Sequence, residues 1–149
     1  MNRHIKAALG ITLCAGLAAC GTPHNPNDLA QKTVEYQCGS GNGQPLSAQY
    51  TFQGQEAMSA KVIFGNQVYN LTRSTTSNSD MVGNTFRGNG YTWTTDKFAY
   101  DTAGQANGTM LTQDMAANPN AQAAVAAGQP AGAATVLARD CKAVGVSDH

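Results

Sequence analysis

The chain has 149 residues, only 12% of them charged, and its nine basic side chains balance nine acidic ones. Soluble domains usually carry about 25% charged residues, and a nucleic-acid-binding surface needs a surplus or a stripe of positive charge. The composition therefore argues against nucleic acid as a partner. The length predicts a single domain, and no apolar run reaches the roughly 18 residues of a membrane-spanning helix.

The N-terminus predicts export. A positively charged start precedes the apolar stretch 7–19, which is the order typical of a secretory signal peptide. The tetrapeptide at 17–20 (LAAC) resembles the bacterial lipobox, in which cleavage removes residues 1–19 and the thiol of Cys20 is lipidated. Several acyl chains on one residue anchor a protein stably. Gly21 favours the outer membrane, on its periplasmic or its surface face. An ordinary secretory signal that contains a cysteine is the alternative.

The segment 20–32 is predicted to be a tether. It contains two prolines and shows no hydrophobic periodicity. Such a segment cannot bury enough apolar surface to offset the entropy lost on ordering. We therefore expect it to hold the following domain a short distance from the membrane.

Two cysteines are left for the folded region, because Cys14 leaves with the signal and Cys20 takes the lipid. They are Cys38 and Cys141, near its two ends. In an exported protein a disulfide is the default expectation, and two free thiols are the alternative. A bridge across a loop of about 100 residues stabilises by about 4–5 kcal/mol in the chain-entropy model. It would join the first and last strands.

Short alternating segments between glycine and asparagine turns predict an all-β fold. The pairs Gly65-Asn66 and Asn89-Gly90 are two-residue loops typical of hairpins. The predicted strands are 33–38, 46–53, 57–64, 67–74, 81–88, 91–96, 98–102, 109–113 and 135–141. Such regular short strands favour a sandwich or a barrel. A disulfide between first and last strands fits a closed sheet, so we predict a small antiparallel β-barrel of about eight strands over residues 33–142.

One segment interrupts the strand pattern. Residues 115–134 are rich in alanine, glutamine, glycine and proline. Asn118 could cap a short helix that begins at Pro119, but so short an isolated helix is marginal in water. We predict a flexible insertion between the last two strands, and a C-terminal tail over residues 143–149.

Catalysis has little support. His24 lies in the tether and His149 ends the chain, so a Ser-His-Asp arrangement would need one of them to fold back. The spacings CxxC and HExxH of metal sites are missing from the sequence. Asp80, Asp96 and Asp101 lie in predicted turns, where aspartate is common for conformational reasons. We predict that the protein is not an enzyme and holds no metal or cofactor.

Several stretches together resemble the neisserial adhesin complex proteins. They are the opening strand 32–38, the spacing of Ala60, Val62, Gly65 and Val68, the segment 79–81 followed by 85–91, and the close at 140–142. The broader relatives are membrane-bound and periplasmic inhibitors of c-type lysozyme, which are small antiparallel β-barrels with a terminal disulfide. The resemblance implies that this protein binds and inhibits c-type lysozyme. Surface adhesion is a second activity linked to the family.

The resemblance also implies a contact site. The membrane-bound inhibitors place a serine-rich loop and a Trp-Ser-Lys-Gly-type segment in the lysozyme cleft, and the corresponding regions here, 74–80 and 93–97, match loosely. The implied contact residues are Ser77, Asn78, Ser79, Asp80, Trp93, Thr95 and Lys97. Plainer interpretations are open for them: barrel core for Trp93, a simple turn for 77–80, and a solvated charge for Lys97.

Two functions of different classes follow. The first is an envelope lipoprotein that inhibits c-type lysozyme by inserting a polar loop into its active-site cleft. Without Arg3 and Lys6 of the signal, seven basic residues face nine acidic ones, and this net charge of −2 favours a cationic partner. The alternative is an outer-membrane adhesin or structural lipoprotein with no enzyme target. A small-ligand-binding barrel is a third interpretation, and a homodimer is compatible with each.

Overall fold

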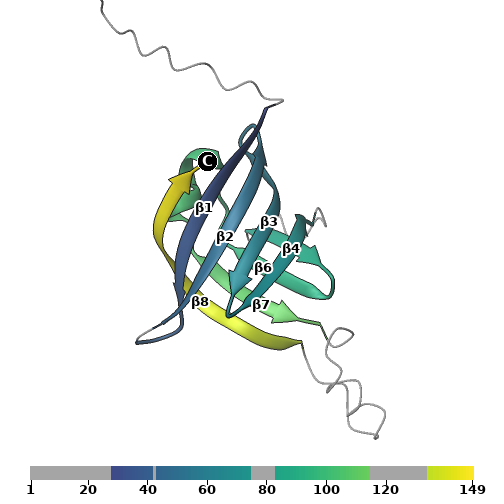
Figure 1. The fold of residues 1–149 in the computed structure, drawn as a ribbon, viewed down its shortest axis with the longest axis vertical. Coiled ribbons are helices and arrows are strands. Elements are labelled where there is room, and N and C mark those ends of the chain that lie inside the picture. The colour runs from purple at the N-terminus through teal and green to yellow at the C-terminus, as the bar shows by residue number, and fades with distance from the viewer. Residues whose placement is uncertain (1–27, 42, 75–82, 115–133) are drawn as a thin grey trace, which may run out of the picture.

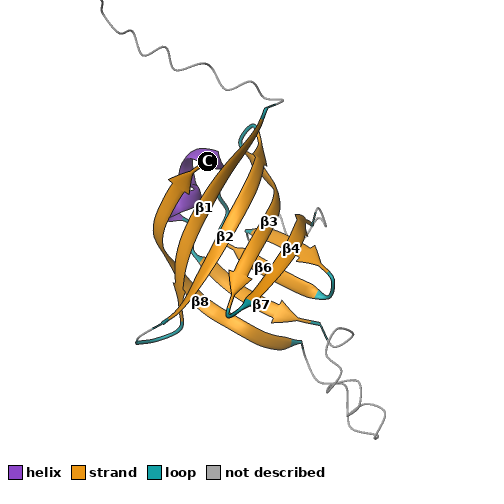
Figure 2. Cartoon of the chain, viewed as in Figure 1, coloured by secondary structure: helices purple, strands orange, loops and turns teal. Residues whose placement is uncertain are grey.

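The predicted barrel is confirmed. The computed structural model describes residues 28–41, 43–74, 83–114 and 134–149, and their strands form one closed antiparallel barrel in which chain neighbours are also spatial neighbours (Figure 1). The strands are β1 (Leu29–Cys38), β2 (Gln44–Gln53), β3 (Glu56–Phe64), β4 (Gln67–Arg73), β5 (Asn84–Gly88), β6 (Tyr91–Thr95), β7 (Gly108–Gln113) and β8 (Thr135–Asp148). A short 3-10 helix, η1 (Tyr100–Gln105), lies between β6 and β7 (Figure 2).

Both predicted hairpin turns are present. The loop at 65–66 joins β3 to β4, and the loop at 89–90 joins β5 to β6. Asn89 and Gly90 have φ values of 50° and 82°, and positive φ at both central residues is what a type I′ turn requires. This turn matches the twist of the strands that it joins, so local sequence fixes their register.

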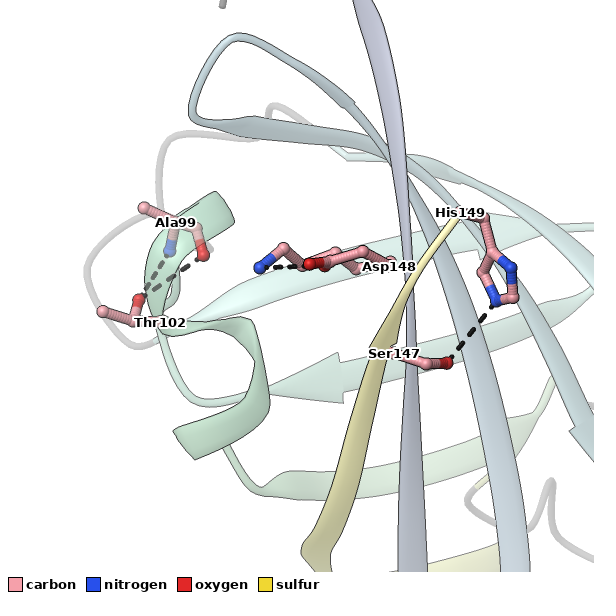
Figure 3. Close-up of polar contacts among 6 residues, drawn as sticks. Ala99, Thr102, Ser147, Asp148 and His149 are labelled. Atoms are coloured by element: carbon pink, nitrogen blue, oxygen red, sulfur yellow. Dashed lines mark hydrogen bonds and ion pairs between the residues drawn. The ribbon is translucent and has the colours of Figure 1, made fainter. Parts of the chain in front are cut away.

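The strand predicted over 98–102 is wrong. This segment runs into η1, where the hydroxyl of Thr102 accepts a hydrogen bond from the backbone N–H of Ala99 and also bonds the Ala99 carbonyl (Figure 3). Local bonds of this kind compete with a strand ladder. Phe98 and Ala103 are buried, so the segment covers one end of the barrel core.

The terminal strands are longer than predicted. β1 begins at Leu29 rather than at residue 33, and β8 runs through the predicted tail to Asp148. The two added ends pair with each other, with Lys32 opposite Asp148, and the Lys32 Nζ lies 3.2 Å from the Asp148 Oδ1. Residues 1–27 and 115–133 carry the predicted signal, most of the tether and most of the insertion. They lie outside the described residues.

The core combines apolar packing with a short polar network. Trp93 Nε1 donates a hydrogen bond of 2.8 Å to the Tyr50 hydroxyl, which lies 3.0 Å from the Tyr36 hydroxyl. All three side chains are essentially inaccessible to solvent. Gly108 makes room for the indole, because a Cβ at this position would collide with it. The network satisfies polar groups that would be costly to bury alone.

The predicted disulfide is present. Cys38 and Cys141 are partners in the β1–β8 ladder, and their sulfurs are bonded. The bridge links residues 103 positions apart. It therefore fastens the two strands whose pairing closes the barrel.

Reduction of this bond should destabilise the barrel by about 4–5 kcal/mol, because it frees a loop of about 100 residues in the unfolded chain. Urea denaturation with and without dithiothreitol measures the difference. The Cys38→Ser/Cys141→Ser double variant should match the reduced protein and be insensitive to dithiothreitol. A loss below about 1 kcal/mol would show that the barrel closes without the bond.

Stability should also fall above pH 10. Burial raises the pKa of Tyr36 to about 12 and the pKa of Tyr50 well above 10. Unfolded tyrosines ionise near pH 10. The contribution of the neutral hydroxyls is therefore complete below pH 10, and it is lost as the pH rises towards the folded-state pKa. The loss in the free energy of unfolding that is due to Tyr36 alone is roughly 2–3 kcal/mol by pH 12.

The Tyr36→Phe variant isolates this effect. It should lose about 1 kcal/mol at pH 8 through the missing hydrogen bond, and then decline less steeply between pH 10 and 12 than the wild type. Urea denaturation across this range measures both slopes. Parallel slopes would contradict the assignment.

Candidate functional site

The described residues that flank or belong to the predicted contact segments, Ser74, Gly83 and Lys97, lie at one end of the barrel, here called the Lys97 end. The topology gathers there the start of β1, the β2–β3 turn at 54–55, residues 74 and 83, the segment 96–107 and the end of β8. The opposite end, here called the turn end, carries the loops at 39–43, 65–66 and 89–90. Figure 1 shows the start of β1 and the end of β8 together at the Lys97 end.

Four of the predicted contact residues lie outside the described residues: Ser77, Asn78, Ser79 and Asp80. The structure does place the two residues that flank the segment containing them. The backbone N–H of Ser74 donates a 2.8 Å hydrogen bond to the carbonyl of Thr85. Gly83 lies so close to the carbonyl of Thr95 that no Cβ would fit there. Ser74 and Gly83 therefore lie beside the start of β5 and the end of β6. Cys20 also lies outside the described residues.

Two more predicted contact residues have buried side chains. Trp93 is 0% exposed and Thr95 is 2% exposed. The Thr95 hydroxyl donates to the carbonyl of Asp96 at 2.8 Å. Trp93 therefore belongs to the barrel core, and neither side chain reaches the surface of the barrel.

Lys97 is exposed on a loop with a closed neck. The backbone N–H of Asp96 donates to the carbonyl of Asn107 at 2.9 Å, and the N–H of Asn107 donates back to the Asp96 Oδ2 at 3.1 Å. The Asn107 Oδ1 also accepts a 3.2 Å hydrogen bond from the backbone N–H of Ala143 on β8. These bonds close the 96–107 loop at its neck and tie it to β8.

The backbone just after Lys97 is held from inside the barrel. Asn84 is 2% exposed, and its Nδ2 donates to the carbonyl of Phe98 at 3.4 Å. The Phe98 ring packs at 4.8 Å between centroids against Tyr50. Two residues further on, the N–H of Tyr100 donates to the Gln55 carbonyl at 3.1 Å. Lys97 is thus presented on a well-supported stretch of backbone.

On its other side, the 96–107 loop contacts the terminal strands β1 and β8. The Lys32 ammonium lies 4.1 Å from the centre of the Tyr100 ring, in the geometry of a cation–π contact. The same ammonium pairs with Asp148, which Figure 3 shows at the end of β8 beside Ser147 and His149. One half-buried cation thus connects η1 to both termini of the barrel.

Carboxylates outnumber free cations at the Lys97 end. Arg73 pairs with Glu56 at 3.2 Å, and Lys32 pairs with Asp148. Lys97 makes no ion pair or hydrogen bond with any residue that the structure describes. The exposed aspartates of this end are Asp28, Asp96, Asp101 and Asp148. Among the described residues, an ammonium without an ion-pair partner lies near several carboxylates, and this arrangement is complementary to an acidic group on a partner whose remaining surface is cationic.

The described residues show two further absences. They bring together no group of three or more histidine, cysteine, aspartate or glutamate side chains that could hold a metal ion. None of their helices is long and apolar enough to cross a membrane.

The architecture defines a small β-barrel domain that a disulfide closes between its first and last strands. The family model described as ACP-like domain, of the Neisseria type, matches residues 32–143. This chain belongs to that family, which confirms its resemblance to the neisserial adhesin complex proteins. No curated protein matches it.

Sequence reasoning missed Asn84, Asn107 and Lys32 as supports of the loop. A signal for Asn84 was present, because it shares the inward face of β5 with Phe86 and a buried amide needs a partner. Lys32 contacts Tyr100 and Asp148, which only the closed barrel brings near it, so its sequence neighbours give no sign of the role. Asn107 bonds Asp96 in its own loop and Ala143 of β8, and the second contact depends on the pairing of β7 with β8.

Asn84→Ala should release the 96–107 loop without opening the barrel. Loss of a buried donor that satisfies a carbonyl costs about 1–3 kcal/mol, and amide exchange should speed up most at residues 97–100. Hydrogen exchange read by NMR measures both effects. Asn70→Ala, at an exposed position on β4, is the matched control. Equal protection in the two variants would contradict this role of Asn84.

Proposed function

We propose that this protein is a lipid-anchored envelope protein that binds and inhibits c-type lysozyme. The observation that carries the proposal is the placement of Lys97. It is exposed, unpaired among the described residues and held on a closed loop. Residues 74 and 83, which flank the hydroxyl-rich segment 75–82, lie at the same end of the barrel. The family supports this proposal through its resemblance to lysozyme inhibitors.

Inhibition of this kind needs no chemistry from the inhibitor. A retaining glycosidase such as lysozyme works with two carboxyl groups about 5 Å apart. The Lys97 ammonium has three donors and no acceptor, so it can bond an ionised carboxylate directly. The hydroxyls of Ser77 and Ser79 and the amide of Asn78 would bond the remaining polar groups. Occupation of the cleft then excludes the peptidoglycan substrate.

The support of Lys97 matters for affinity. Binding immobilises side chains and loops, at a cost of about 0.5–1.5 kcal/mol for each flexible side chain. The neck at Asp96 and Asn107 and the Asn84 bond hold the backbone before lysozyme arrives. A hydrogen bond to a charged group contributes about 1.5–3 kcal/mol, and less of this is lost when the backbone is already placed.

The remaining charges favour the encounter. The exposed aspartates around Lys97 give this end a negative field, which steers a cationic enzyme towards it. Steering of this kind weakens as salt rises, because the Debye length is about 8 Å at physiological ionic strength. We propose that acylated Cys20 holds the domain at the outer membrane, where lysozyme would meet the cell envelope.

Adhesion is the second candidate function, and the outer face of β1–β4 favours it. A groove of about 270 Å³ there is lined mainly by uncharged polar side chains, among them Gln31, Gln49, Thr51 and Asn70. Amides and hydroxyls suit hydrogen bonding to a neutral polar surface. An adhesin of this kind would leave lysozyme activity untouched.

The test is inhibition of a c-type lysozyme that clears a peptidoglycan suspension. Oxidised protein comprising residues 21–149 should inhibit stoichiometrically at sub-micromolar concentration. Lys97→Met should raise the inhibition constant at least 10-fold, because it removes a charge-assisted bond worth about 1.5–3 kcal/mol. Lys61→Met, at an exposed position on β3, is the matched control and should inhibit as the wild type does.

Two outcomes would count against the proposal. If folded, oxidised wild-type protein leaves lysozyme activity unchanged, adhesion becomes the favoured function. If the wild type inhibits but Lys97→Met inhibits equally well, the protein is an inhibitor and the Lys97 assignment is wrong.

A further inference from the structure

The point where the tether joins the barrel lies close to the proposed lysozyme site. β1 begins at Leu29, which pairs with Gln53 just before the β2–β3 turn. Tyr100 of η1 donates its N–H to Gln55 in that turn and lies against Lys32 of β1. The 96–107 loop, and Lys97 with it, is therefore at the barrel end from which any N-terminal anchor must leave.

Covalent geometry limits the distance between the lipid anchor at Cys20 and the start of β1. Eight residues, 21–28, separate Cys20 from the first strand. From the Cα of Cys20 to the Cα of Leu29 there are nine residue steps, which span at most about 30–32 Å in any conformation, since one residue extends the chain by at most about 3.3–3.6 Å. A globular enzyme of ordinary domain size has a radius of gyration of about 13–15 Å, hence a diameter of roughly 35 Å. The tether is shorter than the enzyme.

We propose that the Lys97 end faces the membrane in the anchored protein, and that tether length therefore regulates its access to lysozyme. The inference rests on the proposed lipidation of Cys20 and extends the proposed inhibition. An upright barrel leaves too small a gap for the enzyme, so the anchored protein binds it only when the barrel tilts. The turn end, with the loops at 65–66 and 89–90, faces away from the membrane.

The negative charge of the Lys97 end maintains the distance between the barrel and the bilayer. The exposed aspartates at 28, 96, 101 and 148 lie at the Lys97 end, and two of its three cations, Lys32 and Arg73, are paired. Like charge repels the end from anionic headgroups. The barrel is therefore held near the bilayer by its tether and does not adsorb on it. Lys97 stays in water, accessible to small molecules and shielded from large ones.

The first arm of the test measures orientation without lysozyme. Lipidated Lys97→Cys and Asn66→Cys variants are reconstituted in vesicles of phosphatidylethanolamine and phosphatidylglycerol, and their soluble counterparts begin at residue 21. Each is labelled with a bulky polyethylene-glycol maleimide and, as the control for thiol reactivity, with N-ethylmaleimide. Anchoring should slow the bulky reagent at least fivefold at position 97, and hardly at position 66, with the small reagent unaffected.

The second arm varies the tether. Insertion of about twelve glycine and serine residues after Gly21 should restore bulky labelling at position 97. Inhibition is measured with proteins that keep Lys97. With the original tether, inhibition by the anchored protein is expected to be at least 10-fold weaker than inhibition by the soluble protein, and the insertion should restore it. Deletion of residues 22–27 should weaken the anchored protein further and leave the soluble one unchanged.

The failures can be told apart. Equal bulky labelling at positions 97 and 66, or a missing acyl mass on Cys20, would overturn the orientation whatever lysozyme does. Absence of inhibition by the soluble protein would sink the proposed function, while the labelling arm still decides which end faces the membrane. Soluble and anchored proteins that inhibit equally at every tether length would overturn regulation by the tether.

Discussion

The last strand is the constraint on which the rest of the barrel depends, because it changes partners midway. Its first half pairs with β7 and its second half with β1, and Cys141 is paired on both sides, opposite Gly108 and Cys38. The change is fixed by Asp140, whose φ is 52°, and by the Gly39 N–H, which bonds the carbonyls of Arg139 and Asp140. Without this change of partner the sheet would have two open edges. The disulfide holds β1 and β8 together at the position where the change occurs.

Closure also determines what the Lys97 end can do. The second half of β8 brings Ala143 to the neck of the 96–107 loop and Asp148 to Lys32. From inside, Asn84 and the Phe98 ring connect the same loop to the core around Tyr50. A loop that is fixed from the strand ladder and from the core can present one charge at a defined position, which is what an inhibitor without chemistry of its own needs.

Local sequence predicted the features that local physics controls. The turns at 65–66 and 89–90, the alternation of buried and exposed residues, and the pairing of two cysteines in an exported chain were all visible in the sequence. The strand over 98–102 was wrong, because Thr102 satisfies the backbone of Ala99 locally. The lengths of β1 and β8 could not be predicted, because their ends pair with each other across the whole chain.

The candidate site was predictable only in part, for the same reason. Lys97 is exposed beside the end of β6, whereas Trp93 and Thr95 alternate into the core. The residues that support Lys97 lie on β1, β5 and β8 and at position 107 of the loop itself, and no short sequence window contains them all. The most direct measurement is an NMR titration of isotope-labelled residues 21–149 with unlabelled c-type lysozyme. We expect shifts concentrated at Lys97 and the rest of the Lys97 end, whereas shifts confined to the turn end or to the outer face of β1–β4 would contradict the proposed contact surface.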